Sequence, residues 1–258
     1  MKDPKSILIT GASGGLGAAL ARAYAAPGVA LALTGRNEAR LEASAESCRE
    51  HGAEVATTVI DVIDAEALAA WIAEIDERRP LDLVIANAGI SGGTAGGEGP
   101  EQTRRIFAVN LDGAINTILP VIPRMRARRR GQLALMSSLA AFRALPGSPA
   151  YSASKAAVKF WGEALRGSLW RDGVGVSVIC PGYVRTPMTD INTYPMPMLM
   201  DAATAAARIK RGLARNRARI AFPLPMYVLV WLLGALPPAL TDPLFARLPG
   251  KSSLPDRA

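Results

Sequence analysis

The chain has 258 residues, half of them apolar, and a formal net charge of +8, so it is long enough to bury one substantial hydrophobic core. Its two cysteines argue against a disulfide framework and favour a reducing compartment, so we expect a cytoplasmic protein. The one histidine, His51 at a predicted helix end, excludes a histidine-rich metal site and the usual histidine-based catalytic triad.

Short apolar runs alternate along the chain with longer stretches of helical periodicity. In order, we predict a strand over residues 6–10, a helix over 15–26, a strand over 29–34, a helix over 38–51, a strand over 54–60, a helix over 65–78 and a strand over 81–86. There follow a long helix over 101–128 that bends near Pro120 and Pro123, a strand over 132–137, a helix over 151–171, a strand over 174–180, a helix over 201–216 and a last strand over 219–222.

Strands that are almost entirely apolar and are separated by helices are typical of a parallel sheet covered on both faces. With right-handed crossovers, the pattern predicts the α/β class: a single doubly wound, Rossmann-like domain with a seven-stranded, mainly parallel sheet. No internal repeat and no linker is visible, so we assign residues 1–258 to one domain, of which 220–258 form an apolar C-terminal extension.

A glycine-rich segment joins the first predicted strand to the first helix. Gly11 can turn the chain, Gly15 lets the backbone approach a pyrophosphate, and Gly17 lets the helix pack closely on the sheet. The start of a helix also offers N–H groups and a partial positive charge to a phosphate. The spacing, Gly-x-x-x-Gly-x-Gly, differs from the common Gly-x-Gly-x-x-Gly, and an ordinary turn is the alternative. We predict a dinucleotide site that also includes Ser13 and Leu16.

The end of the second predicted strand bears on the choice of cofactor. NAD enzymes usually carry a carboxylate there for the ribose 2′-hydroxyl, but this chain has Gly35 followed by Arg36. A guanidinium suits a 2′-phosphate, so we favour NADP(H) over NAD(H). A solvated surface arginine is the alternative.

Two further strand ends complete the predicted cofactor site. Asp61 and Val62 follow the third strand and are expected to frame the adenine, with Asp61 accepting from its amino group. The residues after the fourth strand are expected to line the adenosine ribose or to support the sheet, and they are Asn87, Ala88 and Gly89.

The segment with the most chemical content lies between residues 136 and 155. Ser138 precedes Tyr151, and Lys155 follows Tyr151 by one helical turn, which places the phenol and the amine on one helix face. The Lys155 ammonium and the positive nicotinamide ring of a bound cofactor both favour the phenolate, so we expect the pKa of Tyr151 to fall toward working pH. Taken singly, Ser138 is explained as a helix cap, Tyr151 as an aromatic residue at the edge of the core and Lys155 as a residue on a solvated helix face. Ser137, the rival serine, is one residue off the spacing and is expected to point away.

In their order and spacing, these motifs resemble those of the short-chain dehydrogenase/reductase family. The resemblance covers residues 6 to about 190 and departs from the common pattern at Ala86, where many members have a second asparagine. It implies an NAD(P)-dependent oxidoreductase that forms a homodimer or homotetramer through two long helices. The residues that carry the resemblance are Thr10, Gly11, Gly15, Gly17, Asn87, Ala88, Gly89, Asn110, Ser138, Tyr151, Lys155, Pro181 and Gly182.

The resemblance also implies a role for each residue of the catalytic set. Tyr151 protonates a carbonyl oxygen in reduction and acts as the base in oxidation. Ser138 hydrogen-bonds the same oxygen, and Lys155 holds the hydroxyls of the nicotinamide ribose. Asn110, on the long helix, positions a water that links Lys155 to solvent.

The segment after the sixth predicted strand lies at the carboxyl edge of the sheet, where α/β folds bind ligands. It begins with Pro181 and Gly182. We expect Val184 to contact the carboxamide of the cofactor through its backbone, and Thr186 to contact the carboxamide or a phosphate.

The second half of the chain is basic, and its end is apolar. Residues 1–100 carry 8 Lys and Arg against 14 Asp and Glu, whereas residues 101–258 carry 22 against 8. This asymmetry favours an anionic partner, such as NADP phosphates, acyl-carrier or CoA groups, or lipid headgroups. Prolines in the uncharged segment 220–240 leave no unbroken helix long enough to cross a bilayer. The segment either roofs the substrate pocket or a subunit interface, or lies with Tyr227 and Trp231 on an anionic membrane surface.

Our first hypothesis is an NADP(H)-dependent oxidoreductase that interconverts a ketone and a secondary alcohol on a small hydrophobic substrate. Methionines between residues 188 and 200 favour an apolar substrate, and we expect residues 185–200 to form a mobile flap. The alternatives are a regulator that senses NADP(H) without turnover and a peripheral membrane protein. We expect no metal, and no nucleic-acid partner because no known binding motif is present.

Overall fold

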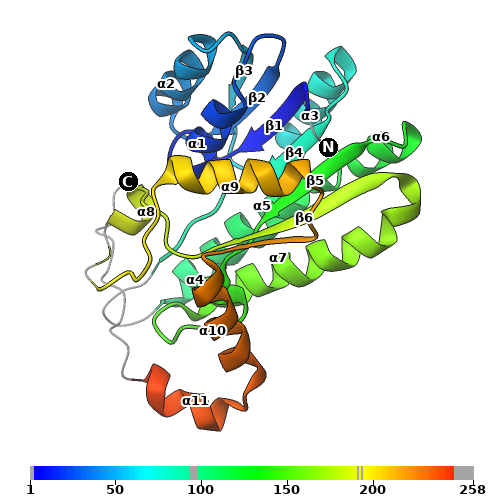
Figure 1. The fold of residues 1–258 in the computed structure, drawn as a ribbon. Coiled ribbons are helices and arrows are strands. Elements are labelled where there is room, and N and C mark those ends of the chain that lie inside the picture. Colours follow the sequence, from blue (N-terminus) through cyan, green and yellow to red (C-terminus); the bar gives the residue numbers. More distant parts are fainter. Residues whose placement is uncertain (1–2, 93–97, 191, 193, 247–258) are drawn as a thin grey trace.

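The computed structural model describes residues 3–92, 98–190, 192 and 194–246, and Figure 1 traces the chain. The strands are β1 (Ser6–Thr10), β2 (Ala30–Gly35), β3 (Glu54–Val59), β4 (Leu83–Ala86), β5 (Gly131–Met136), β6 (Val174–Pro181) and β7 (Arg219–Phe222). They form one 7-stranded sheet in the order β3-β2-β1-β4-β5-β6-β7, and every ladder is parallel. The predicted doubly wound, Rossmann-like domain is confirmed, with its topological switch point between β1 and β4.

Helices cover both faces of this sheet. They are α1 (Gly15–Tyr24), α2 (Glu38–Arg49), α3 (Ala65–Arg78), α4 (Pro100–Phe107), α5 (Gly113–Ile118), α6 (Ile122–Ala127), α7 (Pro149–Ser168), α8 (Pro187–Asp190), α9 (Ala202–Ala214), α10 (Leu224–Ala235) and α11 (Pro238–Phe245). Buried side chains of α1, α2 and α9 form one core cluster with one face of the sheet, and those of α3, α5 and α7 form a second cluster with the other face.

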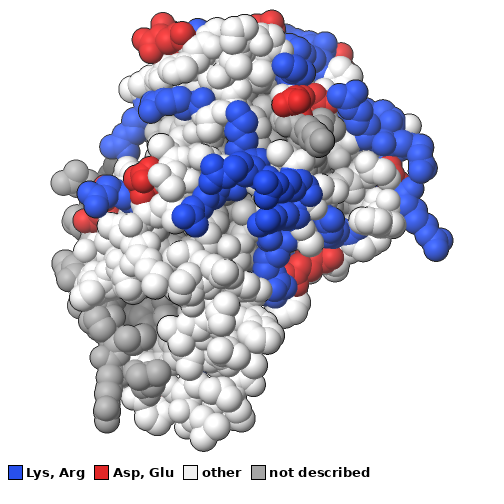
Figure 2. Space-filling model, viewed as in Figure 1, with Lys and Arg blue, Asp and Glu red and all other residues white. Residues whose placement is uncertain are grey.

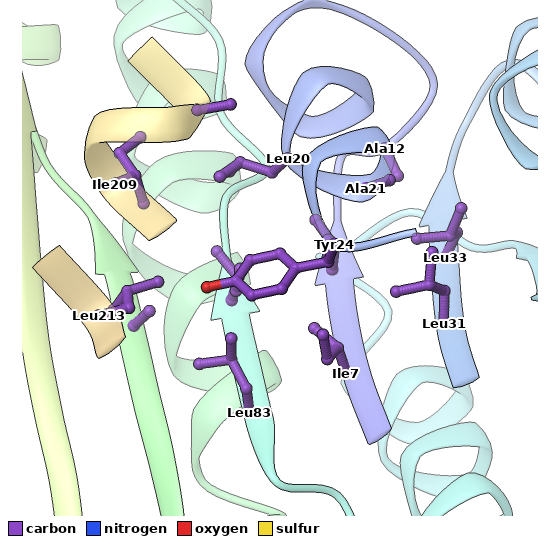
Figure 3. Packing of buried hydrophobic residues seen from close by; sticks show 14 of the residues in the cluster. Ile7, Ala12, Leu20, Ala21, Tyr24, Leu31, Leu33, Leu83, Ile209 and Leu213 are labelled. Carbon is purple, nitrogen blue, oxygen red and sulfur yellow. The ribbon is translucent and has the colours of Figure 1, made fainter. Parts of the chain in front are cut away.

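Figure 3 shows how the first cluster joins α1 to α9. The ring of Tyr24, at the end of α1, extends toward Leu213 of α9 and over Leu83 of β4. Lys210 of α9 lies 5.0 Å from the centroid of this ring and donates to the backbone oxygen of Ala23 at 2.6 Å. Helix α1 begins in the glycine-rich loop. These contacts therefore hold α1, and with it the end of the loop, in place on the sheet.

The predicted long helix over 101–128 is interrupted twice. A π-helical turn, Ala108–Asp112, separates α4 from α5, and a turn next to Pro120 separates α5 from α6. The second break confirms the predicted bend, whereas the π turn was not predicted. The stretch Pro100–Ala127 is long and apolar enough to cross a membrane by length and composition alone, but 50% of its most apolar window is buried. The core helix of a globular domain meets the same criterion.

The chain after the sheet forms α10 and α11, which lie at the lower end of Figure 1. Residues 220–222 of the predicted extension belong to β7 and pair with β6. Beyond them, side chains of α10 pack against the turn that follows β5. The extension therefore lies beside the segment that carries Ser138.

Candidate active site

A cleft of about 400 Å³ lies at the carboxyl edge of the sheet, within the size range of small-molecule and cofactor sites. Strand ends and the loops after them line it, as expected at a topological switch point. Asn110 lies behind this lining. The other predicted site residues all belong to it, namely Gly11, Ser13, Gly15, Leu16, Gly17, Arg36, Asp61, Val62, Asn87, Ala88, Gly89, Ser138, Tyr151, Lys155, Pro181, Gly182, Val184 and Thr186.

Three glycines of the glycine-rich loop, Gly11, Gly15 and Gly17, do not readily admit a side chain. Gly11 and Gly15 have φ angles of +69° and +55°, and a Cβ at Gly17 would lie 2.2 Å from the backbone oxygen of Gly11. No side chain caps the start of α1, so the helix presents its N-terminal end to the cleft. This cradle fits the pyrophosphate of a dinucleotide.

Asn87 supports the glycine-rich loop from the neighbouring strand. Its side-chain nitrogen donates to the backbone oxygens of Thr10 at 2.9 Å and Gly11 at 3.3 Å. The Thr10 hydroxyl in turn accepts from the backbone nitrogens of Asn87 and Ala88 at 3.1 and 3.2 Å. Of the two roles predicted for this segment, the structure therefore supports the one in which Asn87 holds neighbouring parts of the sheet edge together.

The end of β2 leaves no space for a carboxylate at position 35. A Cβ at Gly35 would lie 2.9 Å from the side chain of Ser13. The adjacent Arg36 is half exposed, and its guanidinium lies 3.8 Å from the Asp61 carboxylate. Asp61 also pairs with Arg105 at 2.7 Å, an interaction that the sequence did not predict. This part of the cleft therefore presents a guanidinium and an already paired carboxylate.

Ser138, Tyr151 and Lys155 meet at the other end of the cleft. The phenol of Tyr151 hydrogen-bonds the Ser138 side chain, and the Lys155 amine lies 5.9 Å from the centroid of the tyrosine ring. Ser138 also caps the short 3-10 turn Leu139–Ala141, because its hydroxyl accepts from the nitrogen of Ala140 at 3.1 Å. Thus Ser138 both caps this turn and lies beside the phenol of Tyr151.

Ser137 points away from this group, as predicted. Its hydroxyl is buried and donates to the backbone oxygen of Lys155 at 2.7 Å. The Lys155 amine donates to the oxygen of Met136 at 2.9 Å. These two hydrogen bonds tie the end of β5 to α7 and fix the lysine relative to the tyrosine.

Asn110 sits in the π-helical turn and is buried. Its side-chain nitrogen donates to the oxygen of Ile90 and to the Ser154 hydroxyl, both at 3.0 Å, and its oxygen accepts from the nitrogen of Ile90 at 2.8 Å. Both amide donors are thereby used, while the oxygen keeps one acceptor position. Lys155 and Asn110 approach each other across Gly89, where a Cβ would lie 3.1 Å from each side chain.

Comparison with known proteins decides what kind of cleft this is. A family model described as short chain dehydrogenase matches residues 5–194. The chain belongs to the short-chain dehydrogenase family. It is 39% identical to an uncharacterized oxidoreductase of Myxococcus xanthus over 95% of this chain and 97% of that protein.

Solved structures agree with this family. A short-chain dehydrogenase from Sphingobium yanoikuyae in complex with NADPH superposes with a TM-score of 0.79 at 27% identity, covering 94% of this chain and 96% of that one. A 3-oxoacyl-[acyl-carrier protein] reductase from Brucella melitensis with bound NAD gives a TM-score of 0.72 at 28% identity, covering 84% and 89%. This short-chain dehydrogenase is therefore an oxidoreductase of the class that acts on CH–OH groups.

The protonation behaviour of Tyr151 in this short-chain dehydrogenase differs from the prediction. Burial raises the pKa of Tyr151, and the Ser138 hydrogen bond lowers it only in part. Burial also lowers the pKa of Lys155 to about 8. The expected fall in the tyrosine pKa was wrong for the groups of the chain itself, because the cost of placing a charge in the enclosed cleft exceeds the effect of the Ser138 hydrogen bond, and Tyr183 raises the pKa further.

Arg40 and Glu98 are two charged residues of this short-chain dehydrogenase that were not assigned from the sequence. Arg40, in the first turn of α2, lines the cleft beside Arg36; its position one turn after the strand end was the available signal. Glu98 accepts from the backbone nitrogens of Ala150 at 2.5 Å and Tyr151 at 3.5 Å. Glu98 is 53 residues from Tyr151 in the sequence, so no local pattern could reveal this contact.

Backbone hydrogen bonds join the two ends of the predicted flap over residues 185–200. The nitrogen of Arg185 donates to the oxygen of Met200 at 2.8 Å, and the nitrogen of Met200 donates to the oxygen of Tyr183 at 3.1 Å. Residues 191 and 193 of the segment lie outside the described residues. Its first part supplies Thr186, Pro187, Met188 and Thr189 to the cleft.

Proposed function

We propose that this protein is an NADP(H)-dependent oxidoreductase that interconverts a ketone and a secondary alcohol on a small hydrophobic substrate. The observation that carries the proposal is the contact between the Tyr151 phenol and the Ser138 hydroxyl, beside a buried lysine, in a cleft that also holds the glycine-rich cradle. The complete set argues against a regulator that binds the cofactor without turnover.

The proposed chemistry assigns a separate task to each side chain. When bound, the nicotinamide cofactor supplies or accepts the hydride. Tyr151 donates its phenolic proton to the carbonyl oxygen in reduction and receives it back in oxidation. Ser138 donates a hydrogen bond to the same oxygen and stabilises the negative charge that develops on it.

Lys155 and Asn110 support the phenol in this scheme. One donor of the Lys155 amine is held by Met136, which leaves two for the ribose hydroxyls. When protonated, Lys155 also stabilises the phenolate form of Tyr151. The remaining acceptor position of Asn110 suits a water that passes protons between Lys155 and solvent.

The preference for NADP(H) rests on the residues at the end of β2. Arg36 and Arg40 both line this part of the cleft, and Gly35 cannot be replaced by an acidic residue without contact with Ser13. Two guanidinium groups suit a 2′-phosphate. One structural relative contains NADPH and another NAD, so the proposal depends on these residues of the chain itself.

An apolar substrate is supported by the surroundings of Ser138. A Cβ at Gly182 would lie 3.1 Å from the sulfur of Met226 and 3.4 Å from the side chain of Leu139, so apolar side chains of α10 and the 3-10 turn lie next to this end of the cleft. We further propose a homodimer or homotetramer formed through the long helices, because Phe160 on α7 is 66% exposed, and a cytoplasmic location, because both cysteines are free.

Substitution of Tyr151 by Phe tests the reaction. NADPH oxidation is followed with medium-chain 3-oxoacyl thioesters, steroids and simple ketones. We expect turnover to fall by about 10²–10⁴-fold, the usual contribution of a general acid, while the Kd for NADPH from fluorescence titration changes by less than about twofold, because the hydroxyl is not needed to hold the phosphates.

The matched control is Tyr24→Phe, which removes a phenol from the core away from the cleft. It should leave turnover unchanged. Equal carbonyl reduction by Tyr151→Phe and the unmodified enzyme would overturn the mechanism. Binding of NADPH without hydride transfer to any carbonyl in the panel would favour the regulator.

A further inference from the structure

Helix α10 presents apolar side chains to solvent as well as to the core. Its inner face packs Met226, Tyr227 and Val230 against the cluster that includes Leu139 and Phe142. Its outer face is also apolar, and the exposed fractions there are Leu224 65%, Val228 44%, Leu229 55%, Trp231 51% and Leu232 51%. A helix that is apolar on every side is found in a protein core or in contact with lipid, and a large exposed apolar patch marks an interaction surface.

An apolar region around this helix adjoins a basic region of the surface. Residues 220–240 contain no Lys, Arg, Asp or Glu. Figure 2 shows the region over α10 and α11 free of charged side chains on this face, while Lys and Arg gather above it over α9. Both regions are visible from one side of the molecule, so a partner on that side faces both.

The basic region contains cations without acidic partners. Arg208 and Arg211 of α9 are exposed, as are Arg215 and Arg217 in the segment after it. None of these four forms an ion pair within the part of the chain that the structure describes. Unpaired cations beside an apolar helix are the arrangement by which interfacial helices recognise anionic lipid.

We propose that the outer face of α10 docks on the surface of an anionic lipid bilayer, with the arginines of α9 and the segment after it facing the headgroups. The helix has 12 residues, which gives a length of roughly 18 Å, too short to cross a hydrocarbon core of about 30 Å. It therefore lies in the plane of the interface. Trp231 is suited to that depth because an indole has an apolar body and a polar nitrogen.

A second copy of the chain fits the same surface less well. The outer face of one helix of this length offers less accessible surface than the roughly 800 Å² that each partner of a stable interface buries. A bilayer extends beyond the helix and carries the charge opposite to that of the exposed arginines.

The outer face is preformed, because α10 is held firmly at its inner side. Arg219 donates to Glu163 of α7 at 2.9 Å through Nε and to the Tyr227 hydroxyl at 2.9 Å. A Cβ at Gly234 would lie 2.0 Å from the backbone oxygen of Phe142, so helix and turn are in direct backbone contact. Docking therefore requires no release of α10 from the domain.

Vesicle flotation of the full chain tests the proposal. Vesicles of phosphatidylcholine alone are compared with vesicles that also contain phosphatidylglycerol. We expect the protein to float with the anionic vesicles, and binding to weaken by roughly tenfold or more at about 1 M salt, where screening is nearly complete. The double variant Trp231→Glu/Leu232→Glu should also bind roughly tenfold more weakly or worse, because two charges enter the apolar face.

The control is Trp170→Glu, which places one such charge at a tryptophan that is 70% exposed outside α10; it should float like the unmodified protein. Thermal unfolding checks that each variant is folded. Equal flotation of the α10 double variant and the control overturns the proposal, as does absence of the unmodified protein from anionic vesicles. A dimer in light scattering that the double variant converts to monomers, without vesicle binding, assigns the face to a second copy instead.

Discussion

At the scale of single residues, the cleft holds two groups whose burial opposes their charge. Tyr151 and Lys155 lie one helical turn apart, and burial favours the neutral form of each: it raises the pKa of the phenol and lowers that of the amine to about 8. Lys155 is 4% exposed, and its charged form therefore costs stability that a surface lysine would not. The same enclosure that disfavours these charges strengthens every electrostatic contact with a reacting oxygen.

Lys155 makes the stability of the protein depend on pH. Its pKa is about 8 in the folded protein and about 10.4 in an unfolded chain. Between these values the unfolded chain binds more protons, so the free energy of unfolding rises with pH. Relative to Lys155→Met, which lacks the titration, the cofactor-free protein should gain about 2 kcal/mol between pH 7 and pH 9.5.

Urea unfolding at both pH values measures this gain. The difference between the two proteins isolates Lys155 from other titrating groups, because those are common to both. If the free energies of unfolding of the two proteins change equally between pH 7 and pH 9.5, the amine keeps an ordinary pKa in the folded state.

Arg36 carries the proposed preference for NADP(H). Arg36→Leu should raise the KM for NADPH by roughly 10- to 100-fold, the effect of losing a charge-assisted hydrogen bond, and leave the KM for NADH nearly unchanged. Steady-state kinetics with both cofactors give the two values. Arg78→Leu, which removes an arginine paired with Glu74 on α3, is the control and should change neither. A parallel rise for both cofactors would mean that Arg36 does not contact the 2′-phosphate.

At the scale of elements, the catalytic helix begins with help from a distant residue. Ser148, the N-cap of α7, makes no side-chain cap hydrogen bond. Glu98 supplies the acceptor instead, for the first-turn nitrogens of Ala150 and Tyr151. A carboxylate at this end of a helix is favoured by the helix dipole as well as by the hydrogen bonds. The position of Tyr151 thus depends on the segment that leads into α4.

Glu98→Ala should lower both stability and turnover. We expect a loss of about 1 kcal/mol in the free energy of unfolding, as for other caps, and a fall in kcat that exceeds any change in the KM for NADPH, because the phenol loses its fixed place. Glu98→Gln should recover much of the turnover, since its amide oxygen still accepts from the two nitrogens.

The control for this prediction is Asp64→Ala on α3. Asp64 accepts from the nitrogen of Ala67 at 3.0 Å, so it caps a helix that does not carry the catalytic set. Its loss should lower stability by a similar amount and leave kcat unchanged. Equal kcat losses in the two alanine variants would reduce Glu98 to a purely structural cap.

At the scale of the whole molecule, the sequence predicted what depends on local pattern. Apolar runs of strand length placed β1 to β7 within a few residues, and the spacing of Tyr151 and Lys155 needed only one helical turn. The π turn around Asn110 was not predictable, because it follows from hydrogen bonds to Ile90 and Ser154 from other parts of the chain. The direction of the Tyr151 pKa was likewise missed, since burial depends on the packing of several distant segments.

Because the sheet connects the cleft to α10, we expect the whole molecule to unfold as one unit. Strand ends from β1 to β6 line the cleft, and β7 joins α10 to the same sheet. A ligand in the cleft therefore stabilises the whole domain by mass action, by about 2.7 kcal/mol at a concentration of 100 Kd. For a domain of this size that should raise the Tm by roughly 5–10 °C.

NADPH should give the larger shift than NADH at equal concentration, and calorimetry should show one transition with and without ligand. A separate low-temperature transition that ligand leaves in place, and that disappears when residues 223–258 are removed, would mean that the C-terminal helices fold apart from the domain.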